Sequence, residues 1–389
     1  KVSGLNLLYQ KRTYSNALKN DSILRKSMSK EKYTGKDLDA YMPTEINIKK
    51  AKNSMLSLFQ MYDIMDSYNK DFLEEFGDFL DSEEKKVEAA TTPPKNYRAD
   101  IVKDNYQDLN DRFYGNNDVM ASEKSAMHGT HVSGLIGADR NNGIGVKGIA
   151  DNVKIMMLRV VPNGDEHDKD IALAIRYAVN NGAQIINMSF GKGFSPQKQW
   201  IDDAVRYAEA KGVLMVQAAG NDHKNIDNFP NFPTPVFKSD GKRASNWITV
   251  GASGDSLTGG IVGYFSNFGK REVDLFAPGL DIYSSVPGEE KYQALQGTSF
   301  SSPIVAGIAA LILEYFPNLS AQQLKSVLEK SVLKPTALVK NPETGDWVNL
   351  SELCRTGGLV NAYEAVKLAA NVKGERKPVK EDTVKLKGF

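Results

Sequence analysis

The sequence predicts an α/β fold: a mostly parallel β-sheet with helices on both faces, plus a helical segment at the N-terminal end. From about residue 98 onward, short runs of apolar, β-branched residues alternate with longer segments of helical periodicity. The apolar runs are nearly uninterrupted, which is typical of strands that helices cover on both sides. The first 97 residues show helical periodicity and few glycines.

The alternation predicts individual elements. Strands are expected at residues 154–161, 184–189, 213–217 and 247–252. Helices are expected at residues 128–138, 171–180, 200–211, 299–316 and 321–330. Asp168 and Ser320 are the expected N-terminal caps of two of these helices. Because active sites of such sheets lie at the carboxyl ends of the strands, the residues that follow each strand are the first candidates for function.

The N-terminal region differs in character from the rest of the chain. Apolar residues between Leu58 and Phe79 recur at steps of three and four, which predicts one long amphipathic helix whose apolar stripe docks on the body of the protein. Residues 82–97, a charged run followed by Thr-Thr-Pro-Pro, are typical of a linker. We therefore divide the chain into a helical segment (1–97), an α/β domain (98–371) and a charged tail (372–389).

Composition excludes several classes of protein. Of the 389 residues, 25% are charged and the net charge is only +1, so general binding to nucleic acid is not expected. No uninterrupted apolar run has the length of a membrane span. The single cysteine, Cys354, excludes an internal disulfide framework. The chain starts at Lys1 without an initiator Met or a signal peptide, and we expect it to be part of a longer precursor.

Three residues could carry chemistry. Ser299 starts the most apolar predicted helix, where free N–H groups and the helix dipole would stabilise an anion, although a serine there could simply cap the helix. His128 lies at the start of another helix and could act as a general base, or be a structural histidine like the expected role of His131. Asn221 follows a strand and could hold an oxyanion, or be a turn residue. The two histidines lack the neighbouring Glu and third ligand of a metal site, so no metal is expected.

Taken in the order His, Asn, Ser, these residues resemble the subtilisin family of serine peptidases. Five segments carry the resemblance, which covers about residues 98–370: His128-Gly-Thr-His-Val-Ser-Gly, Asn187-Met-Ser-Phe-Gly, Ala219-Gly-Asn, Phe276-Ala-Pro-Gly and Gly297-Thr-Ser-Phe-Ser-Ser-Pro. The resemblance implies a subtilisin-like fold and an endopeptidase that is secreted or held in the cell envelope. It also implies that Ser299 is the nucleophile and His128 its general base, with Asn221 and the Ser299 N–H forming the oxyanion hole.

The resemblance further implies a protein or peptide substrate. The second of the five segments ends a strand in small residues, which would let an extended peptide pair with its backbone, although a plain core strand could end in the same way. The implied substrate-binding residues are Ser189, Phe190, Gly191, Ala218, Ala219 and Gly220. No cofactor is expected. Calcium is common in the family, but no loop here has recognisable ligand spacing, and the acidic loop 165–170 is expected to be a solvated turn that caps the next helix.

One element of the family pattern is not found. An apolar strand ending in Asp-Ser-Gly or Asp-Thr-Gly should precede His128, and the nearest candidate, Asp104, follows a short run that a lysine interrupts. The chain resembles large bacterial members with an insertion between the Asp and His motifs. The Asp strand would then precede Lys1, on a separate N-terminal fragment, and residues 1–97 would belong to the insertion. An incorrectly oriented triad lowers kcat about 10⁴-fold in serine proteases.

Two alternatives to a peptidase stay open. The chain could be a catalytically silent subtilisin-like protein that keeps the peptide cleft for binding, although a pure binder needs no base, amide donor and nucleophile together. An esterase of another α/β type fits poorly, because the Gly-x-Ser-x-Gly elbow is not what surrounds Ser299.

Overall fold

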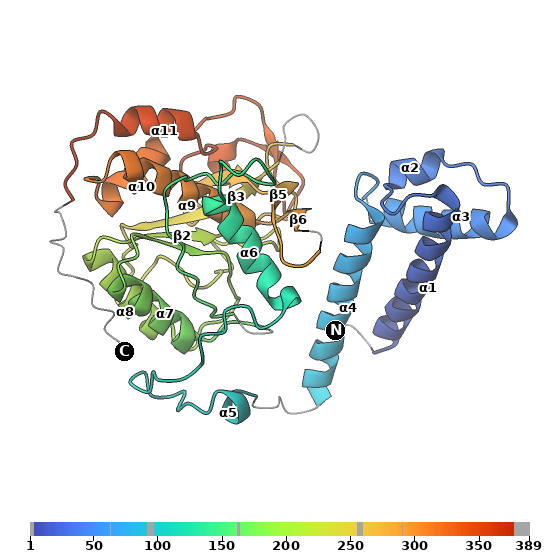
Figure 1. The fold of residues 1–389 in the computed structure, drawn as a ribbon, viewed down its shortest axis with the longest axis horizontal. Coiled ribbons are helices and arrows are strands. Elements are labelled where there is room, and N and C mark those ends of the chain that lie inside the picture. Colours follow the sequence, from blue (N-terminus) through green and yellow to red (C-terminus); the bar gives the residue numbers. More distant parts are fainter. Residues whose placement is uncertain are drawn as a thin grey trace. The chain divides into compact units, whose positions relative to one another are not determined.

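The computed structural model describes residues 4–62, 64–91, 97–161, 164–254, 260–289 and 291–376. Contacts divide the chain into two compact units, Lys1–Ile101 and Val102–Phe389, coloured blue to cyan and cyan to red in Figure 1. The sequence places this boundary after residue 97. Most of the predicted tail, from residue 377 onward, lies outside the described residues.

The first unit is helical. Its elements are α1 (Gly4–Met28), α2 (Gly35–Ala40), α3 (Ile46–Met61), α4 (Asn69–Thr91) and α5 (Tyr97–Ile101). Helix α1 packs against α3 and α4. The core of the unit contains Leu24, Met55, Phe59, Phe72 and Phe76, all less than 10% exposed. Of the apolar stripe recognised in the sequence, Leu58, Phe72 and Phe76 are buried within this unit, whereas Met61, Tyr68 and Phe79 are exposed.

The prediction of a single long helix between Leu58 and Phe79 is wrong, because α3 ends at Met61 and α4 begins only at Asn69. The buried side chain of Asn69 accepts a hydrogen bond from the backbone N of Tyr33 (2.9 Å) and donates one to Asp21 (2.6 Å). These contacts hold the start of α4 against a distant part of the chain. Helix α4 also extends to Thr91, so residues 82–91 of the expected linker are helical; residues 92–96 lie outside the described residues.

The second unit contains the predicted parallel sheet and confirms the fold class. Four parallel strands lie side by side in the order β1 (Ile185–Met188), β2 (Leu214–Ala218), β3 (Trp247–Ser253) and β4 (Leu275–Pro278). Ile185 pairs with Leu214, and Met215 pairs with Trp247. Side chains alternate between the faces: Leu214 and Val216 face one helical layer and Met215 faces the other.

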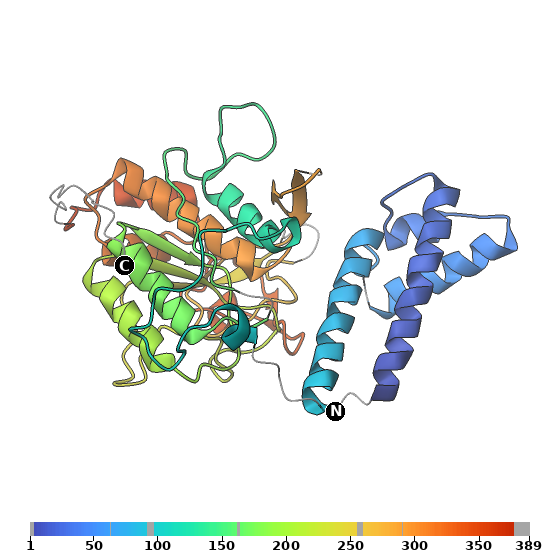
Figure 2. The same ribbon diagram turned by 60° about the horizontal axis from the view of Figure 1, so that its bottom comes forward.

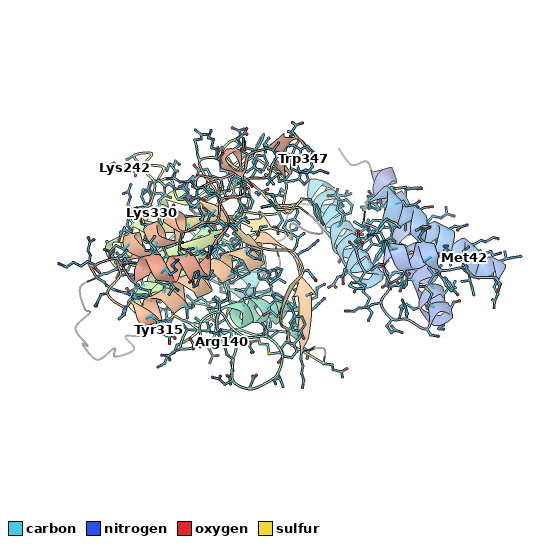
Figure 3. The ribbon with its side chains drawn as sticks, turned by 90° about the horizontal axis from the view of Figure 1, so that it is seen from above. Met42, Arg140, Lys242, Tyr315, Lys330 and Trp347 are labelled. Carbon is cyan, nitrogen blue, oxygen red and sulfur yellow. The ribbon has the colours of Figure 1, made fainter. Side chains whose placement is uncertain are left out.

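Helices cover both faces of the sheet (Figure 2). On one face, α9 (Thr298–Tyr315) contacts all four strands, and α10 (Ala321–Lys330) and α11 (Ala362–Ala369) pack beside it. On the other face lie α7 (Asp168–Asn180) and α8 (Lys198–Ala210). Figure 3 labels Tyr315 and Lys330, the last residues of α9 and α10. Helix α9 is long and apolar enough to cross a membrane, but 67% of it is buried within the protein, where the core helix of a globular domain lies.

The remaining described elements of the second unit are one helix, two antiparallel strand pairs and a short 3-10 helix. Helix α6 (Glu123–Gly137) packs against α9 and against the antiparallel hairpin of β5 (Ile282–Ser285) and β6 (Tyr292–Leu295). A second antiparallel pair, β7 (Val339–Lys340) and β8 (Trp347–Val348), precedes the short 3-10 helix η1 (Leu350–Glu352).

The expected cap of α10 is confirmed, whereas the expected cap of α7 and the expected solvated loop before α7 are wrong. Ser320 caps α10 through a reciprocal capping box with Gln323. The Asp168 carboxylate does not cap α7, because it forms an ion pair with Lys192 (2.8 Å) and accepts a hydrogen bond from the backbone N of Gln197 (2.8 Å). The acidic loop is not solvated either, since Glu166 and Asp168 are both buried.

The strand expected at residues 154–161 is also not formed. Residues 153–160 carry the expected apolar side chains, but in the described part of the chain they pair with no strand. A strand requires a neighbouring strand for its hydrogen bonds, and the apolar run alone does not supply one.

Candidate active site

The first turn of α9 is tied to the carboxyl end of β2 by side-chain hydrogen bonds. The backbone N and the Oγ1 of Thr298 both donate to Asn221 Oδ1, at 2.9 and 2.8 Å. Thr298 Oγ1 in turn accepts from the backbone N of Gly220 (3.0 Å). Since both bonds from Thr298 occupy the Oδ1 of Asn221, the Nδ2 group stays available as a donor, and Asn221 is exposed to solvent.

The same turn is tied to the carboxyl end of β1. Ser189 Oγ donates to the backbone O of Ser299 (2.6 Å), and Ser299 Oγ donates to the backbone O of Ser189 (3.1 Å). Asn187 donates to Ser189 Oγ (2.9 Å) and accepts from Ser302 Oγ (2.5 Å). The structure therefore brings Ser299, Asn221 and Ser189 together at the carboxyl edge of the sheet.

His128 reaches this edge from α6. That helix begins at Glu123 with Ser122 as its N-cap, so His128 lies in its second turn rather than at its start. The His128 ring lies 5.7 Å from the ring of Phe300, the residue that follows Ser299. His131 contacts the same phenyl ring at 4.4 Å. In the described part of the chain, no hydrogen bond joins His128 to Ser299, whose hydroxyl is turned toward Ser189.

Close contact with the β5–β6 hairpin fixes the position of α6. Ser284 Oγ donates to the backbone O of His131 (2.8 Å), and Ser285 Oγ to that of Thr130 (3.3 Å). A Cβ at Gly134 would lie 2.4 Å from Ser285 Oγ and 2.5 Å from Ser284 Oγ. Glycine at position 134 therefore permits the approach that sets the orientation of α6.

The surroundings of His128 favour its neutral form. Although part of the residue reaches solvent, desolvation by the surrounding protein lowers the pKa of His128, and the nearby His131 lowers it further. Burial also lowers the pKa of His131, partly offset by its contact with the backbone O of Gln293 at 3.1 Å. Among the described residues, no carboxylate contributes to the pKa of His128.

Asp104, the nearest candidate for the missing acid in the sequence, has another partner. Its carboxylate forms an ion pair with Lys169 at 2.7 Å, and both side chains are fully buried. Lys169 also donates to the backbone O of Asn105 (2.7 Å). The pair explains why an aspartate occurs at this position: Lys169 would otherwise be an uncompensated buried charge. Within the described ranges, no three His, Cys, Asp or Glu side chains are grouped to hold a metal ion.

The expected cleft residues lie on either side of Asn231. A Cβ at Gly191 would collide with Asn231 Nδ2, whereas one at Gly220 would collide first with Asn267 Nδ2 and would lie 3.2 Å from Asn231 Nδ2. Asn231 Nδ2 donates to the backbone O of Ala219 (3.0 Å). The Asn231 carboxamide therefore lies against Gly191, and it shares the space beside Gly220 with Asn267, whose Nδ2 also donates to the backbone O of Ala219 (2.9 Å). Of the remaining cleft residues, Ala218 is buried within β2, and Phe190 packs half-buried against the core beneath α7 and α8.

Asn231 cannot be identified as a cleft residue from the sequence alone. Its only signal is indirect: glycines at positions 191 and 220 permit a close approach, but the sequence does not show what approaches them. The loop that carries Asn231 is held by a pair of backbone hydrogen bonds between Lys192 and Phe232, at 2.9 and 2.7 Å.

The chain is similar to known proteins over most of its length. The model of the subtilase family matches residues 29–355. A thermophilic serine proteinase of Bacillus sp. (strain AK1) is 36% identical over 242 residues, which cover 61% of this chain and 52% of that protein. Subtilisin DY of Bacillus licheniformis is 36% identical over 208 residues, covering 52% and 69%. The chain thus spans about half the length of the first of these relatives.

Solved structures give the same result. The structure of the patellamide maturation protease PatA is 29% identical, with a TM-score of 0.50, and the match covers 63% of this chain and 85% of that one. The protease domain of PatA carrying an S218A mutation gives the same TM-score of 0.50 at 28% identity.

The lowered pKa of His128 can be measured directly. Because desolvation disfavours the imidazolium, we expect its ring signals to titrate with a midpoint below the ordinary value of about 6.5. The measurement is an NMR titration of the histidine ring C–H signals, with His128→Ala identifying the resonance and the guanidinium-unfolded chain as reference. A midpoint at or above that of the unfolded chain would contradict the described environment.

Proposed function

The chain belongs to the subtilase family, and on that premise we propose that it is a serine endopeptidase acting through an acyl-enzyme on Ser299. The observation that carries the proposal is the arrangement of Asn221. Thr298 fixes its Oδ1 beside the nucleophile, which leaves its Nδ2 free to donate to an oxyanion.

The proposed reaction follows from these positions. The Ser299 hydroxyl turns from Ser189 toward His128, which takes its proton as Oγ attacks the scissile carbonyl carbon. The resulting oxyanion accepts hydrogen bonds from Asn221 Nδ2 and from the Ser299 N–H, which lies in the first turn of α9 where helical N–H groups have no preceding carbonyl partner. His128 then protonates the leaving amine, and a water molecule hydrolyses the acyl-enzyme with His128 again as base.

The substrate in this proposal is a protein or peptide in extended conformation. Backbone groups of Ser189 and Gly191, just past β1, would pair with it, and Ala218 to Gly220 would border the pocket for the residue before the cleaved bond. The resemblance to bacterial subtilisins supports an extracellular or cell-envelope location for the protein.

A second candidate is peptide binding without catalysis, and one observation favours it. Among the described residues no carboxylate orients His128, and serine proteases without this contact lose about 10⁴ in kcat. Residues 1–389 by themselves would then bind peptides and react only slowly.

Fluorophosphonate labelling of the full-length protein separates these candidates. We expect labelling at neutral pH that Ser299→Ala abolishes and His128→Ala strongly reduces. Asn221→Ala should slow labelling about 10²–10³-fold, the size known for loss of an oxyanion-hole donor in a protease of this family. Asn371→Ala, at the exposed end of α11, is the matched control and should label normally. Absence of labelling in the full-length protein would exclude the peptidase.

Asn231 is expected to limit the size of the side chain that the pocket accepts before the cleaved bond. We expect Asn231→Gly to enlarge the space between Gly191 and Gly220, and so to favour a large apolar residue before the cleaved bond. The ratio of kcat/KM for a substrate with Phe at that position to one with Ala should rise about tenfold or more. Asn228→Gly, exposed in the same loop, is the control. An unchanged ratio would show that Asn231 does not limit the pocket.

A further inference from the structure

The turn that carries Asn221 is bound by one buried side chain, that of Asn267. This residue is 1% exposed and lies between β3 and β4. Its Oδ1 accepts hydrogen bonds from the backbone N of Asp222 (3.0 Å) and of Lys224 (2.9 Å). Its Nδ2 donates to the backbone O of Ala219 (2.9 Å). A single carboxamide therefore binds the chain both before and after Asn221, and uses both lone pairs of its oxygen.

Gly220, the residue directly before Asn221, lies against the same side chain. The backbone N of Asn267 donates to the backbone O of Gly220 (2.9 Å). A Cβ at Gly220 would collide with Asn267 Nδ2, and the φ of Gly220, +101°, lies in the region that favours glycine. Glycine at this position therefore permits both the turn and its close contact with Asn267.

Asn221 depends on its neighbours for its position. Within the described ranges its backbone makes no hydrogen bond, and its side chain is bound by Thr298 alone. Residues 221–224 are exposed to solvent, so burial contributes little to fixing this turn. The first backbone N–H after Asn221, that of Asp222, is bound by Asn267. The contacts of Asn267 are therefore those that fix the backbone next to the amide donor.

The segment that contains Asn267 is itself fixed to the sheet. Ser266 Oγ donates to the backbone O of Asn267 (2.8 Å) and accepts from the backbone N of Ala252, a residue of β3 (2.9 Å). The backbone N of His223 also donates to the backbone O of Phe265 (2.9 Å). The contacts thus run from β3 through Ser266 and Asn267 to the exposed turn, which is how a rigid scaffold positions a loop that carries a functional group.

A second buried asparagine, Asn246, makes similar bonds away from the site. It is fully buried, its Nδ2 donates to the backbone O of Val213 (2.6 Å), and its backbone O accepts from the backbone N of Met215 (2.7 Å). These bonds lie at the amino end of β2, whereas Asn221 follows the carboxyl end of that strand. Asn246 therefore provides a matched control for the cost of removing a buried carboxamide.

We propose that Asn267 is a positioning residue of the oxyanion hole. It fixes the backbone on both sides of Asn221, while Thr298 fixes the Oδ1 of the Asn221 side chain, so that Nδ2 is held where the oxyanion forms. A displacement of about 1 Å in a site can cost about 10² in rate, so Asn267 acts on the reaction without contacting the substrate. This inference rests on the proposed peptidase function.

The first test compares rates of fluorophosphonate labelling in the full-length protein. We expect Asn267→Ala to slow labelling of Ser299 about 10- to 100-fold. Because Asn267 acts through Asn221, the same substitution should change the rate less than about twofold in the Asn221→Ala background. With a peptide substrate the loss should lie in kcat, with KM changed less than about twofold, because Ser189 and Gly191 keep their backbone groups.

The second test, on the same protein, does not depend on activity. The backbone N–H of Thr298 donates to Asn221 Oδ1 and belongs to α9, a different element from the turn. If Asn267 holds Asn221 in place, Asn267→Ala should speed hydrogen exchange of the Thr298 amide as well as of the Asp222 and Lys224 amides, each at least about tenfold. Exchange followed by NMR at residue resolution measures all three.

Asn246→Ala is the matched control. It should lower the melting temperature about as much as Asn267→Ala, because each substitution removes a buried carboxamide and leaves backbone groups unpaired. It should leave both the labelling of Ser299 and the exchange of the Thr298 amide unchanged. Asn267→Ser leaves room for a water molecule beside the two N–H groups and should give the same pattern as Asn267→Ala with smaller changes. It carries the test if Asn267→Ala does not fold.

The outcomes separate this inference from the proposed function. Faster exchange of the Thr298 amide in Asn267→Ala, with no labelling of the unsubstituted protein, would support the role of Asn267 in placing Asn221 and contradict the peptidase. Labelling that Asn267→Ala slows equally with and without the Asn221 side chain would overturn the inference and leave the peptidase intact. Unchanged exchange of the Thr298 amide, or equal slowing by Asn246→Ala, would also overturn it.

Discussion

The hydrogen bonds between the first turn of α9 and the carboxyl ends of β1 and β2 are the constraint on which the site depends. Thr298 uses Asn221 to satisfy its backbone N–H, and Ser189 and Ser299 exchange hydrogen bonds. The same contacts that anchor a buried helix to its sheet therefore also orient the nucleophile and the amide donor. Local stability and site geometry are coupled, since loss of these bonds would leave buried polar groups unpaired and release Asn221.

A separate set of contacts holds α6, the helix that carries His128. Helix α6 is held by the β5–β6 hairpin, through Gly134, and by the contact of Phe300 with both histidines. Between α6 and the sheet lie the segment Val153–Val160 and a cavity beside β1.

The sequence predicts well what depends on local pattern and poorly what depends on distant partners. Helices α7 to α10 follow from periodicity, whereas α6 begins five residues before its expected start and α11 was not expected. The capping box at Ser320 lies within four residues. The break before α4 depends on Asn69, which binds Asp21 from 48 residues away. Asp168 has the local pattern of a cap but binds Lys192 instead. Asn231 has no local signal at all, because its role follows from the approach of two segments that the fold brings together.

The most direct measurement is a crystal structure of the protein after diisopropyl fluorophosphate has reacted with Ser299. We expect the phosphoryl oxygen to lie about 2.7–3.1 Å from both Asn221 Nδ2 and the Ser299 backbone N, with Thr298 still bound to Asn221 Oδ1. A phosphoryl oxygen that points to solvent, with the Asn221 amide turned away from it, would contradict the account.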